Sequence, residues 1–170
     1  MASEVAIGLG GNLGDPVASF ALAIGRFRAH EAITVTALSS VYRTAPWGNP
    51  DQPEFRNMAA LLKTTLDPVT LLTLCLAIEH EAGRERRERW GPRTLDLDIL
   101  KAGEAVIDRP RLQLPHPRAA QRAFVLVPLA EIAPQMTLGD ATIADLLSAL
   151  PTDGVHLDEA ETARLREMLG

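Results

Sequence analysis

The chain has 170 residues, a length that fits one ordinary domain able to fold without a disulfide or a structural metal. Its 17 basic and 22 acidic residues give a net charge of −5, which argues against binding to a nucleic-acid backbone. Cys75 is the single cysteine, which excludes an intramolecular disulfide and a thiolate metal cage. The N-terminus does not resemble a secretory signal, and the most apolar stretch, Leu71–Ile78, is far too short to cross a bilayer, so we expect a cytoplasmic protein.

The first part of the chain predicts a strand, a helix and a second strand. Val5–Leu9 is a short apolar run ended by glycines, as in a buried strand. Asp15 followed by Pro16 predicts a helix start, because the carboxylate caps free N–H groups and proline suits the first helical position. Residues 33–42 are rich in β-branched types and predict a strand. The helix between them has apolar residues at helical spacing, namely Val17, Phe20, Ala21, Ile24 and Phe27.

The middle of the chain repeats this pattern. Residues 45–53 hold three prolines and a glycine and predict a loop, and residues 55–65 return to strand composition. Asp67 and Pro68 again start a helix, which is expected to stop at Gly83. Its apolar face is formed by Leu71, Cys75, Ile78 and Ala82. In residues 94–100, three apolar residues alternate with two aspartates, as in a half-buried strand.

These elements follow one another in the order β-α-β-β-α-β, which predicts an α+β fold with a ferredoxin-like core. Both helices are expected on one face of a single antiparallel sheet. Gly103 is expected to turn a hairpin into Val106-Ile107. Additional C-terminal helices are expected over residues 124–132, 143–150 and 159–169. Since neither a linker nor a repeat divides the chain, residues 1–170 are expected to form a single domain.

Asp96 and Asp98 are separated by one residue on the last of the predicted core strands. Side chains at positions i and i+2 of a strand point to the same face, so the two carboxylates lie close together and repel unless a cation or a proton lies between them. Mg²⁺ is usually held by one or two carboxylates together with water and phosphate oxygens. A solvent-facing strand that happens to alternate acidic and apolar residues is the competing interpretation, and for the pair alone it is the better one.

The ten residues from Arg84 to Arg93 contain five arginines, in a chain that is acidic in total. Gly91 and Pro92 favour a loop here, and arginine can bind phosphate oxygens through two parallel hydrogen bonds. A solvated loop partly neutralised by its two glutamates is the alternative, but it does not account for the aspartate pair that follows. The arginines and the aspartates together predict a site for a metal-bound polyphosphate, and therefore a phosphoryl- or pyrophosphoryl-transfer enzyme.

Three other features carry weaker signals. The segment Gly8–Gly14 fails the dinucleotide-binding fingerprint because Leu13 stands at its third glycine, so a tight strand-to-helix turn is preferred. His116 lies between two prolines in a rigid extended segment, where a phosphate contact and a purely structural role both stay open. Aromatic side chains near the predicted site could stack a flat heterocycle, although core filling is the better interpretation of the two phenylalanines among them: Trp47, Phe55, Trp90 and Phe124.

Residues 89–100, Arg-Trp-Gly-Pro-Arg-Thr-Leu-Asp-Leu-Asp-Ile-Leu, closely resemble the signature of the 6-hydroxymethyl-7,8-dihydropterin pyrophosphokinases of folate biosynthesis. Further matches occur in the same order between about residue 5 and residue 135. They are Gly11-Asn12, residues 39–46, Asp51-Gln52-Pro53 with Asn57, Gly83-Arg84, residues 114–117, and residues 127–129 with 132–134. Residues 136–170 carry no motif.

The resemblance implies transfer of the β,γ-diphosphate of ATP to the hydroxymethyl oxygen of the pterin, with AMP as the other product. It implies that Asp96 and Asp98 hold two Mg²⁺ ions that bridge the phosphates. Four arginines would be catalytic by neutralising charge on the transferred group: Arg84 and Arg93, assisted by Arg86 and Arg122. The implied ATP-binding set is Glu79, Arg84, Arg93, Ile99, Arg111, Leu112, Gln113, His116 and Arg122.

The resemblance also implies a pterin pocket. Phe55 and Phe124 would sandwich the pterin, and Asn57, with the backbone of residues 44–48, would hydrogen-bond its edge. The implied set is Thr44, Pro46, Trp47, Gly48, Phe55, Asn57, Trp90 and Phe124. The chain departs from the family at Trp47, where a smaller aliphatic residue is usual, at Gly11, where serine is usual, and at Glu85, which lies between two arginines. None of these departures removes a metal or phosphate ligand.

We therefore expect a 2-amino-4-hydroxy-6-hydroxymethyldihydropteridine diphosphokinase that acts as a monomer on small molecules, with no nucleic-acid or membrane partner. One competing interpretation is a non-catalytic ferredoxin-like module that binds a small ligand and regulates a partner. The aspartate pair beside five arginines argues against it. The other is a nucleic-acid-binding ferredoxin-like domain, which the acidic charge and the lack of interleaved aromatics in residues 55–65 disfavour.

Overall fold

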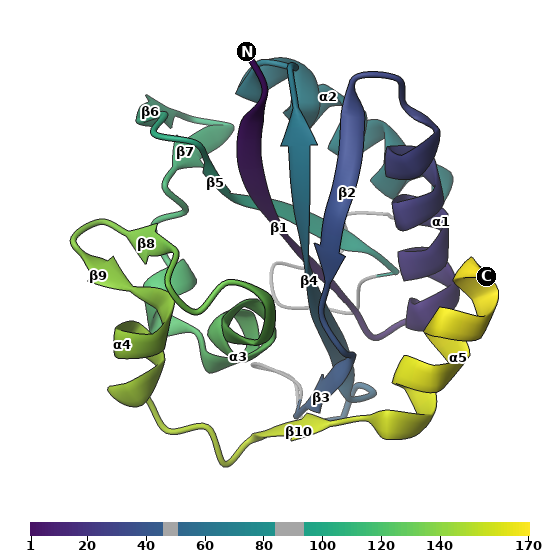
Figure 1. Ribbon diagram of the computed structural model, residues 1–170. Helices are drawn as coiled ribbons and strands as arrows, with labels where there is room; N and C mark the ends of the chain where they lie inside the picture. Colours follow the sequence, from purple (N-terminus) through teal and green to yellow (C-terminus); the bar gives the residue numbers. More distant parts are fainter. Residues whose placement is uncertain (46–50, 84–93) are drawn as a thin grey trace.

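The chain folds around one antiparallel sheet. The structure, a computed structural model, describes residues 1–45, 51–83 and 94–170. The sheet contains β1 (Ser3–Gly11), β2 (Ile33–Leu38), β3 (Tyr42–Thr44), β4 (Phe55–Thr64), β5 (Asp96–Ala102) and β10 (Val155–Leu157). Its strand order is β10-β3-β4-β1-β5, and β2 also pairs with β4 (Figure 1). The order β5-β1-β4-β2 is that of a ferredoxin-like core, so the predicted α+β class is confirmed.

The remaining elements lie outside this sheet. The helices are α1 (Pro16–Ala29), α2 (Pro68–Glu81), α3 (Ala123–Ile132), α4 (Ile143–Ser148) and α5 (Glu159–Leu169), with a short 3-10 helix at Ala119–Gln121. Two small hairpins are formed by β6 (Ile107–Arg109) with β7 (Leu112–Leu114), and by β8 (Thr137–Leu138) with β9 (Ala141–Thr142). In the described part of the chain, no helix has the length and apolar character that crossing a bilayer requires.

The two core helices begin where the sequence predicts. The Asp15 carboxylate accepts a hydrogen bond from Ala18 N at 3.2 Å, and the Asp67 carboxylate accepts one from Thr70 N at 3.0 Å. Each aspartate thus satisfies a backbone N–H that the first helical turn leaves free. Gly83 has φ of +85° after the end of α2, which is the backbone conformation that favours glycine at a helix end.

The structure corrects two predictions. The strand expected over residues 33–42 ends at Leu38, and a second strand, β3, begins only at Tyr42. Ser39 interrupts the strand, because its backbone N–H donates to Ala59 O and its hydroxyl accepts from Ala59 N. Gly103 does form a turn, with φ of +54°, but β6 pairs with β7 and does not form the expected hairpin with β5. The short strands β8, β9 and β10 carry too few residues for a periodicity, and they are absent from the prediction.

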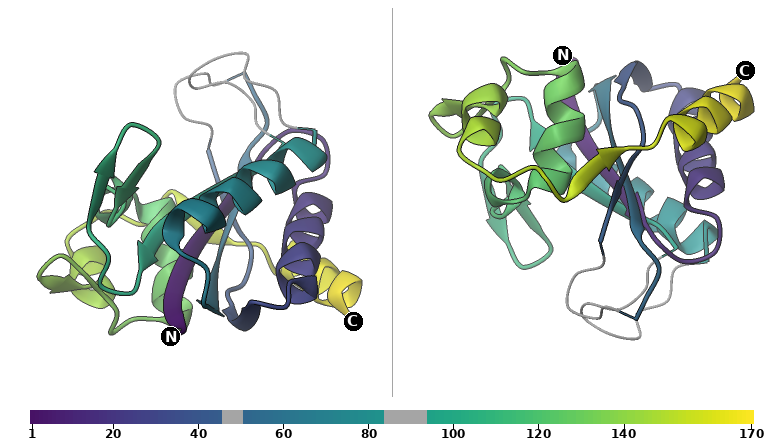
Figure 2. Two further views of the ribbon diagram at one scale, coloured as in Figure 1. Left: turned by 90° about the horizontal axis from the view of Figure 1, so that it is seen from above. Right: turned by 90° about the horizontal axis from the view of Figure 1, so that it is seen from below.

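The sheet lies between two layers of helices (Figure 1 and Figure 2). On one face α1 and α2 cover a core that contains Val5, Ile7 and Leu9 of β1, as the ferredoxin-like prediction requires. On the other face α3 and α4 cover a second core built on Ala6, Ala59 and Leu61. Consecutive strand residues therefore serve opposite cores, so the face that any strand side chain occupies can be read from its neighbours.

Candidate active site

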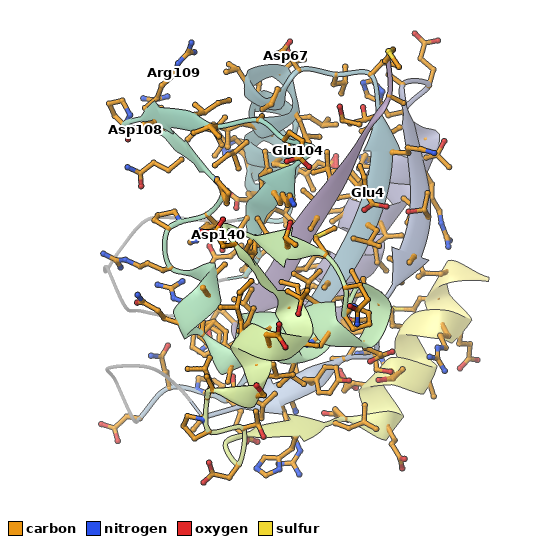
Figure 3. All side chains as sticks on the ribbon, turned by 60° about the vertical axis from the view of Figure 1, so that its left-hand side comes forward. Glu4, Asp67, Glu104, Asp108, Arg109 and Asp140 are labelled. Atoms are coloured by element: carbon orange, nitrogen blue, oxygen red, sulfur yellow. The ribbon has the colours of Figure 1, made fainter. Side chains whose placement is uncertain are left out.

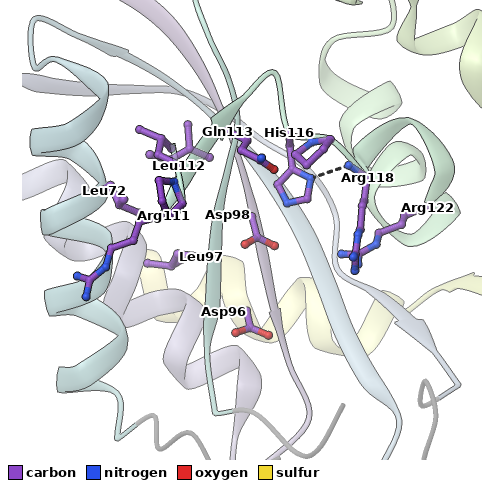
Figure 4. A pocket seen from close by; sticks show the side chains of 13 residues that line it. Leu72, Asp96, Leu97, Asp98, Arg111, Leu112, Gln113, His116, Arg118 and Arg122 are labelled. Atoms are coloured by element: carbon purple, nitrogen blue, oxygen red, sulfur yellow. Dashed lines mark hydrogen bonds between the residues drawn. The ribbon is translucent and has the colours of Figure 1, made fainter. Parts of the chain in front are cut away.

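Asp96 and Asp98 lie on the sheet face that α3 covers. Their neighbours Leu95, Leu97 and Ile99 are at most 4% exposed and belong to the core under α1 and α2, so the aspartates point the other way. Both carboxylates line a cavity of about 450 Å³, in which they lie one above the other on β5 (Figure 4). The alternating segment therefore forms a half-buried strand, as predicted, and the side that carries Asp96 and Asp98 faces the cavity.

Basic side chains surround the two aspartates in this cavity. Arg118 and Arg122 lie on one side of the aspartates and Arg111 on the other, with His116 above them (Figure 4). These groups come from separate segments, because Arg111 directly precedes β7 while Arg118 and Arg122 flank the 3-10 helix. Among the residues that the structure describes, the lining is Leu72, Asp96, Leu97, Asp98, Ile99, Pro110, Arg111, Leu112, Gln113, His116, Pro117, Arg118 and Arg122.

The cavity thus gathers eight of the residues expected for ATP and metal: Asp96, Asp98, Ile99, Arg111, Leu112, Gln113, His116 and Arg122. Arg118 also lines the cavity and is a residue that the sequence analysis missed. The available signal was its position directly after Pro-His-Pro, where a rigid segment fixes the direction of the chain. The expected residues Arg84, Arg86, Trp90 and Arg93, and also Pro46, Trp47 and Gly48, lie outside the described residues.

His116 is held so that one ring nitrogen is already used. Its backbone N–H donates to Leu100 O at 2.9 Å, and its Nδ1 accepts from Arg118 N at 3.2 Å. Burial lowers the pKa of His116, and the positive charges of Arg122 and Arg118 lower it further. The imidazole is therefore neutral near pH 7, and because Nδ1 is an acceptor, the remaining proton is on Nε2. This leaves Nε2–H as a donor for a ligand oxygen.

The charge of Arg122 interacts with both carboxylates of the cavity. Burial lowers its pKa, and the charges of Asp98 and Asp96 oppose that effect. Its guanidinium carbon lies 5.7 Å from the ring centroid of Phe124, within the range of a cation–π contact. Arg122 therefore connects the cavity around Asp98 with the aromatic residue expected at the pterin.

Glu79 has a supporting position in the structure. It is 4% exposed, and its Oε2 accepts a hydrogen bond of 2.7 Å from Leu97 N, the amide between the two aspartates. It does not line the cavity. Since β5 is an edge strand, its outward N–H groups need a partner, and Glu79 on α2 supplies one. The expected contact of Glu79 with the nucleotide stays a prediction.

Two glycines of β1 keep the sheet face clear beside the aspartates. Gly8 pairs with Asp98 on one side and Ala59 on the other, and Gly10 pairs with Asp96 and Asn57. A Cβ at Gly10 would lie 2.9 Å from Asn57 Oδ1, a distance that real Cβ atoms do not tolerate. The absence of a side chain at Gly10 therefore leaves room for the Asn57 amide over β1, the strand that separates Asn57 from Asp96.

Thr44 and Asn57 form a buried polar pair on this face. Asn57 Nδ2 donates to Thr44 Oγ1 at 3.1 Å, and the two residues are 8% and 7% exposed. Phe55 lies two residues from Asn57 on β4 and pairs with Thr44 of β3, which puts all three side chains on the face that α3 covers. The fold thus brings these expected pterin residues to one face, with Phe124 at the start of α3.

The residues at the cavity suit a hard divalent cation such as Mg²⁺. Two carboxylates on one strand face supply oxygen ligands, and Mg²⁺ takes one or two of these while water and phosphate oxygens complete its octahedron. Within residues 1–45, 51–83 and 94–170 no group of three or more His, Cys, Asp or Glu side chains could form an all-protein metal cage. An ion that needs a phosphate to complete its coordination fits this donor set.

Many of the acidic side chains of this protein lie outside the cavity. Figure 3 labels five acidic side chains outside the cavity: Glu4 on β1, Asp67 before α2, Glu104 after β5, Asp108 on β6 and Asp140 between β8 and β9. Among the described residues, the cavity lining combines two carboxylates with three arginines and a histidine, in a protein of net charge −5. This local charge suits an anion that carries a bound cation.

Comparison with known proteins identifies the family. The family model for 7,8-dihydro-6-hydroxymethylpterin-pyrophosphokinase (HPPK) matches residues 6–134. A 2-amino-4-hydroxy-6-hydroxymethyldihydropteridine pyrophosphokinase of Methylorubrum extorquens is 46% identical over 88% of this chain and 95% of its own length. One of the same name from Pseudomonas aeruginosa is 45% identical over 92% of this chain and 97% of its own length.

Solved structures agree with this at the level of the fold. The crystal structure of wild-type HPPK-DHPS of Plasmodium falciparum with pteroate matches 88% of this chain with a TM-score of 0.70 and 15% identity. This chain spans 42% of the length of that one. The family expected from residues 89–100 is thus confirmed, and the chain belongs to the 7,8-dihydro-6-hydroxymethylpterin-pyrophosphokinases.

Proposed function

We propose that this chain transfers the diphosphate of ATP to the hydroxymethyl group of 6-hydroxymethyl-7,8-dihydropterin, giving AMP and the pterin diphosphate. The observation that carries the proposal is the position of Asp96 and Asp98, which face a cavity lined by Arg111, Arg118 and Arg122 on the sheet face that also holds Asn57. Family membership agrees with it, since the relatives carry the name of this enzyme.

The chemistry makes modest demands on the protein. The hydroxymethyl oxygen forms a bond to the β-phosphorus of ATP, the bond from that phosphorus to the α,β-bridging oxygen breaks, and the hydroxyl proton is released. No nucleophile from the protein is needed, so catalysis consists of positioning and electrostatic stabilisation. Asp96 and Asp98 would hold Mg²⁺, which supplies charge neutralisation on the phosphates when bound.

Several residues that the structure describes can be assigned roles in binding the phosphates, the adenine and the pterin. Arg122 faces the phosphates from the side opposite β5 and, through Phe124, adjoins the pterin. His116 donates from Nε2 to a phosphate oxygen, because its Nδ1 is occupied by Arg118 N. The adenine is expected against Leu72, Ile99 and Leu112, the apolar part of the cavity lining. Asn57, oriented by Thr44, presents its amide to the edge of the pterin.

Several further expectations belong to the same proposal. Two Mg²⁺ ions are bound per active site, and Arg84, Arg86 and Arg93 assist Arg122 on the transferred group. Trp90 and the backbone of residues 44–48 complete the pterin pocket. Residues 1–170 form a single domain that works as a monomer in the cytoplasm.

The test is AMP formation from ATP, measured with and without the hydroxymethyl pterin and with and without Mg²⁺. We expect AMP and the pterin diphosphate in equal amounts, and only when both the pterin and the metal are present. ADP as the product would contradict diphosphate transfer, and pterin binding without any turnover would favour the non-catalytic module.

A further inference from the structure

The C-terminal strap, which we define as β10 and α5 (residues 155–169), closes the outer edge of the sheet beside the expected pterin residues. It crosses from the side of α3 and α4 to the side of α1 (Figure 1 and Figure 2, right). β10 pairs with β3 in the register Val155 with Thr44 and Leu157 with Tyr42. Thr44, the partner of Asn57, is thus held between β4 and the strap.

The strap also fixes the residue that precedes β3. Val41 N donates to Thr162 Oγ1 at 2.9 Å, and Asp158 N donates to Val41 O at 2.9 Å. Both polar groups of the Val41 backbone are therefore paired with the strap, in a place where Val41 is fully buried and Thr162 is 6% exposed. β3 is held by the C-terminal strap at both of its ends.

A largely buried ion pair connects the strap to β4. Arg56 Nε donates to Asp158 Oδ2 at 2.9 Å, and the two side chains are 24% and 13% exposed. By contrast, Arg164 and Asp15, which join α5 to α1, are 40% and 43% exposed. Asp158 uses its other oxygen to cap α5, since Oδ1 accepts from Glu161 N at 3.1 Å. A charge this buried is costly to leave unpaired, so the Arg56–Asp158 contact is expected to be persistent.

Arg56 lies between two expected pterin residues. Phe55 and Asn57 precede and follow it on β4, so their side chains point to the α3 face while that of Arg56 points to the opposite face, where it meets the strap. An ion pair on one face of a strand fixes the backbone from which the neighbouring side chains project on the other face. The strap therefore acts on Thr44 through the β10 ladder, and on Phe55 and Asn57 through Arg56.

We propose that Asp158 and Arg56 are positioning residues for the pterin, through which the C-terminal strap orients Thr44, Phe55 and Asn57. The inference rests on the proposed function and adds to it a role for residues that touch neither substrate. The inference concerns the pterin residues and not those expected for ATP and metal. The strap contacts β3 and β4, whereas the aspartates lie on β5 and the cavity arginines lie on segments that follow β5 in the chain.

The experiment compares three variants that break the ion pair, Asp158→Asn, Arg56→Met and the double variant. Asparagine caps helices as well as aspartate, so Asp158→Asn keeps the start of α5 while removing the charge. We expect the Kd and KM for the hydroxymethyl pterin to rise about tenfold in each single variant, because Phe55 and Asn57 adjoin Arg56 on β4 and neighbouring residues typically couple by this much. The double variant is expected to be no worse than the worse single one, and the KM for ATP is expected to stay at the wild-type value.

Two further variants separate positioning from general stability. Arg56→Lys keeps the charge and is expected to recover most of the pterin affinity. Arg164→Ala removes an ion pair of the same helix that does not touch β3 or β4, and it is expected to leave both KM values unchanged. Pterin binding is followed by fluorescence titration as well as by turnover, on protein whose folded fraction is measured by circular dichroism.

The outcomes are distinguishable. Wild-type pterin affinity in Asp158→Asn and Arg56→Met would overturn the positioning role while leaving the proposed function intact. An equal loss of pterin affinity, ATP affinity and folded fraction would also overturn it, since that pattern indicates a stabilising contact alone. A wild-type protein that forms no AMP would overturn the proposed function itself, and with it this extension.

Discussion

Replacing Gly10 by alanine tests how the glycines of β1 shape the site. The added Cβ would lie 2.9 Å from Asn57 Oδ1 and 3.8 Å from Arg56 O, so the Asn57 amide has to move. That amide donates to Thr44 Oγ1 at 3.1 Å, and both residues are at most 8% exposed. Because Asn57 is 8% exposed, a displaced amide finds little water to replace the lost partner. The substitution therefore breaks a buried hydrogen bond without removing either partner.

The size of the effect follows from this burial. Leaving a buried donor or acceptor without a partner costs about 1–3 kcal/mol, and alanine recovers roughly 0.5–1 kcal/mol of the strand propensity that glycine lacks. We expect the free energy of unfolding to fall by about 1–2 kcal/mol. If Asn57 binds the edge of the pterin, losing that hydrogen bond weakens pterin binding by a further ~1 kcal/mol, or about fivefold.

Gly8→Ala is the matched control. Gly8 lies two residues earlier on the same face of β1, and the nearest atoms to a Cβ there belong to the Leu100 side chain, at an ordinary contact distance of 3.6 Å. We expect Gly8→Ala to leave pterin affinity unchanged and unfolding free energy unchanged or slightly raised. The assays are urea denaturation and fluorescence titration with the pterin. Wild-type pterin affinity in Gly10→Ala, or an equal loss in Gly8→Ala, would refute the reasoning.

Three further predictions concern the cavity. Asp98→Asn is expected to lower the rate of AMP formation about a thousandfold, because a bound metal supplies several kcal/mol of charge stabilisation. The urea midpoint is expected to stay unchanged. A near-normal rate would contradict the metal assignment. Glu79→Ala is expected to lower the free energy of unfolding by about 1–3 kcal/mol, because Leu97 N loses its acceptor. Glu79→Gln keeps an acceptor oxygen and is expected to lower the free energy of unfolding by less. Equal losses of stability in the two variants would contradict the role of Glu79 as the acceptor for Leu97 N. Because folding lowers the pKa of His116, the unfolded chain binds the proton first, so stability should fall as the pH drops below the ordinary imidazole pKa of about 6.5. Urea midpoints between pH 5 and pH 8 measure how steeply stability changes with pH. We expect a smaller change in His116→Gln, and an equal change in both proteins would count against the buried neutral imidazole.

The chemistry of the site was readable from local sequence. The alternation around Asp96 and Asp98 places both carboxylates on one strand face whatever the rest of the fold does, since the period of a strand is two residues. The Asp-Pro pairs at residues 15 and 67 likewise start helices through contacts within one turn. The ferredoxin-like order follows from these elements, because a β-α-β-β-α-β chain has few ways to bury its apolar faces.

Other features depend on contacts between distant segments, and these no local pattern predicts. Ser39 splits the expected strand because it binds Ala59 across the sheet. Arg118 lies in the cavity because the segment after β7 returns to β5, where His116 N donates to Leu100 O. Gly10 reads from the sequence as part of a tight turn, and only its pairing with Asn57 and Asp96 shows why a side chain cannot be there.

Residues 136–170 illustrate the same division most clearly. Their helices can be predicted from local sequence, since Glu159–Leu169 has a helical pattern that depends only on neighbours along the chain. The pairing of β10 with the sheet and the contact of Asp158 with Arg56 could not be predicted in this way. Three strand residues carry no usable periodicity, and an ion pair between residues 102 positions apart in the sequence forms only once the sheet has brought them together.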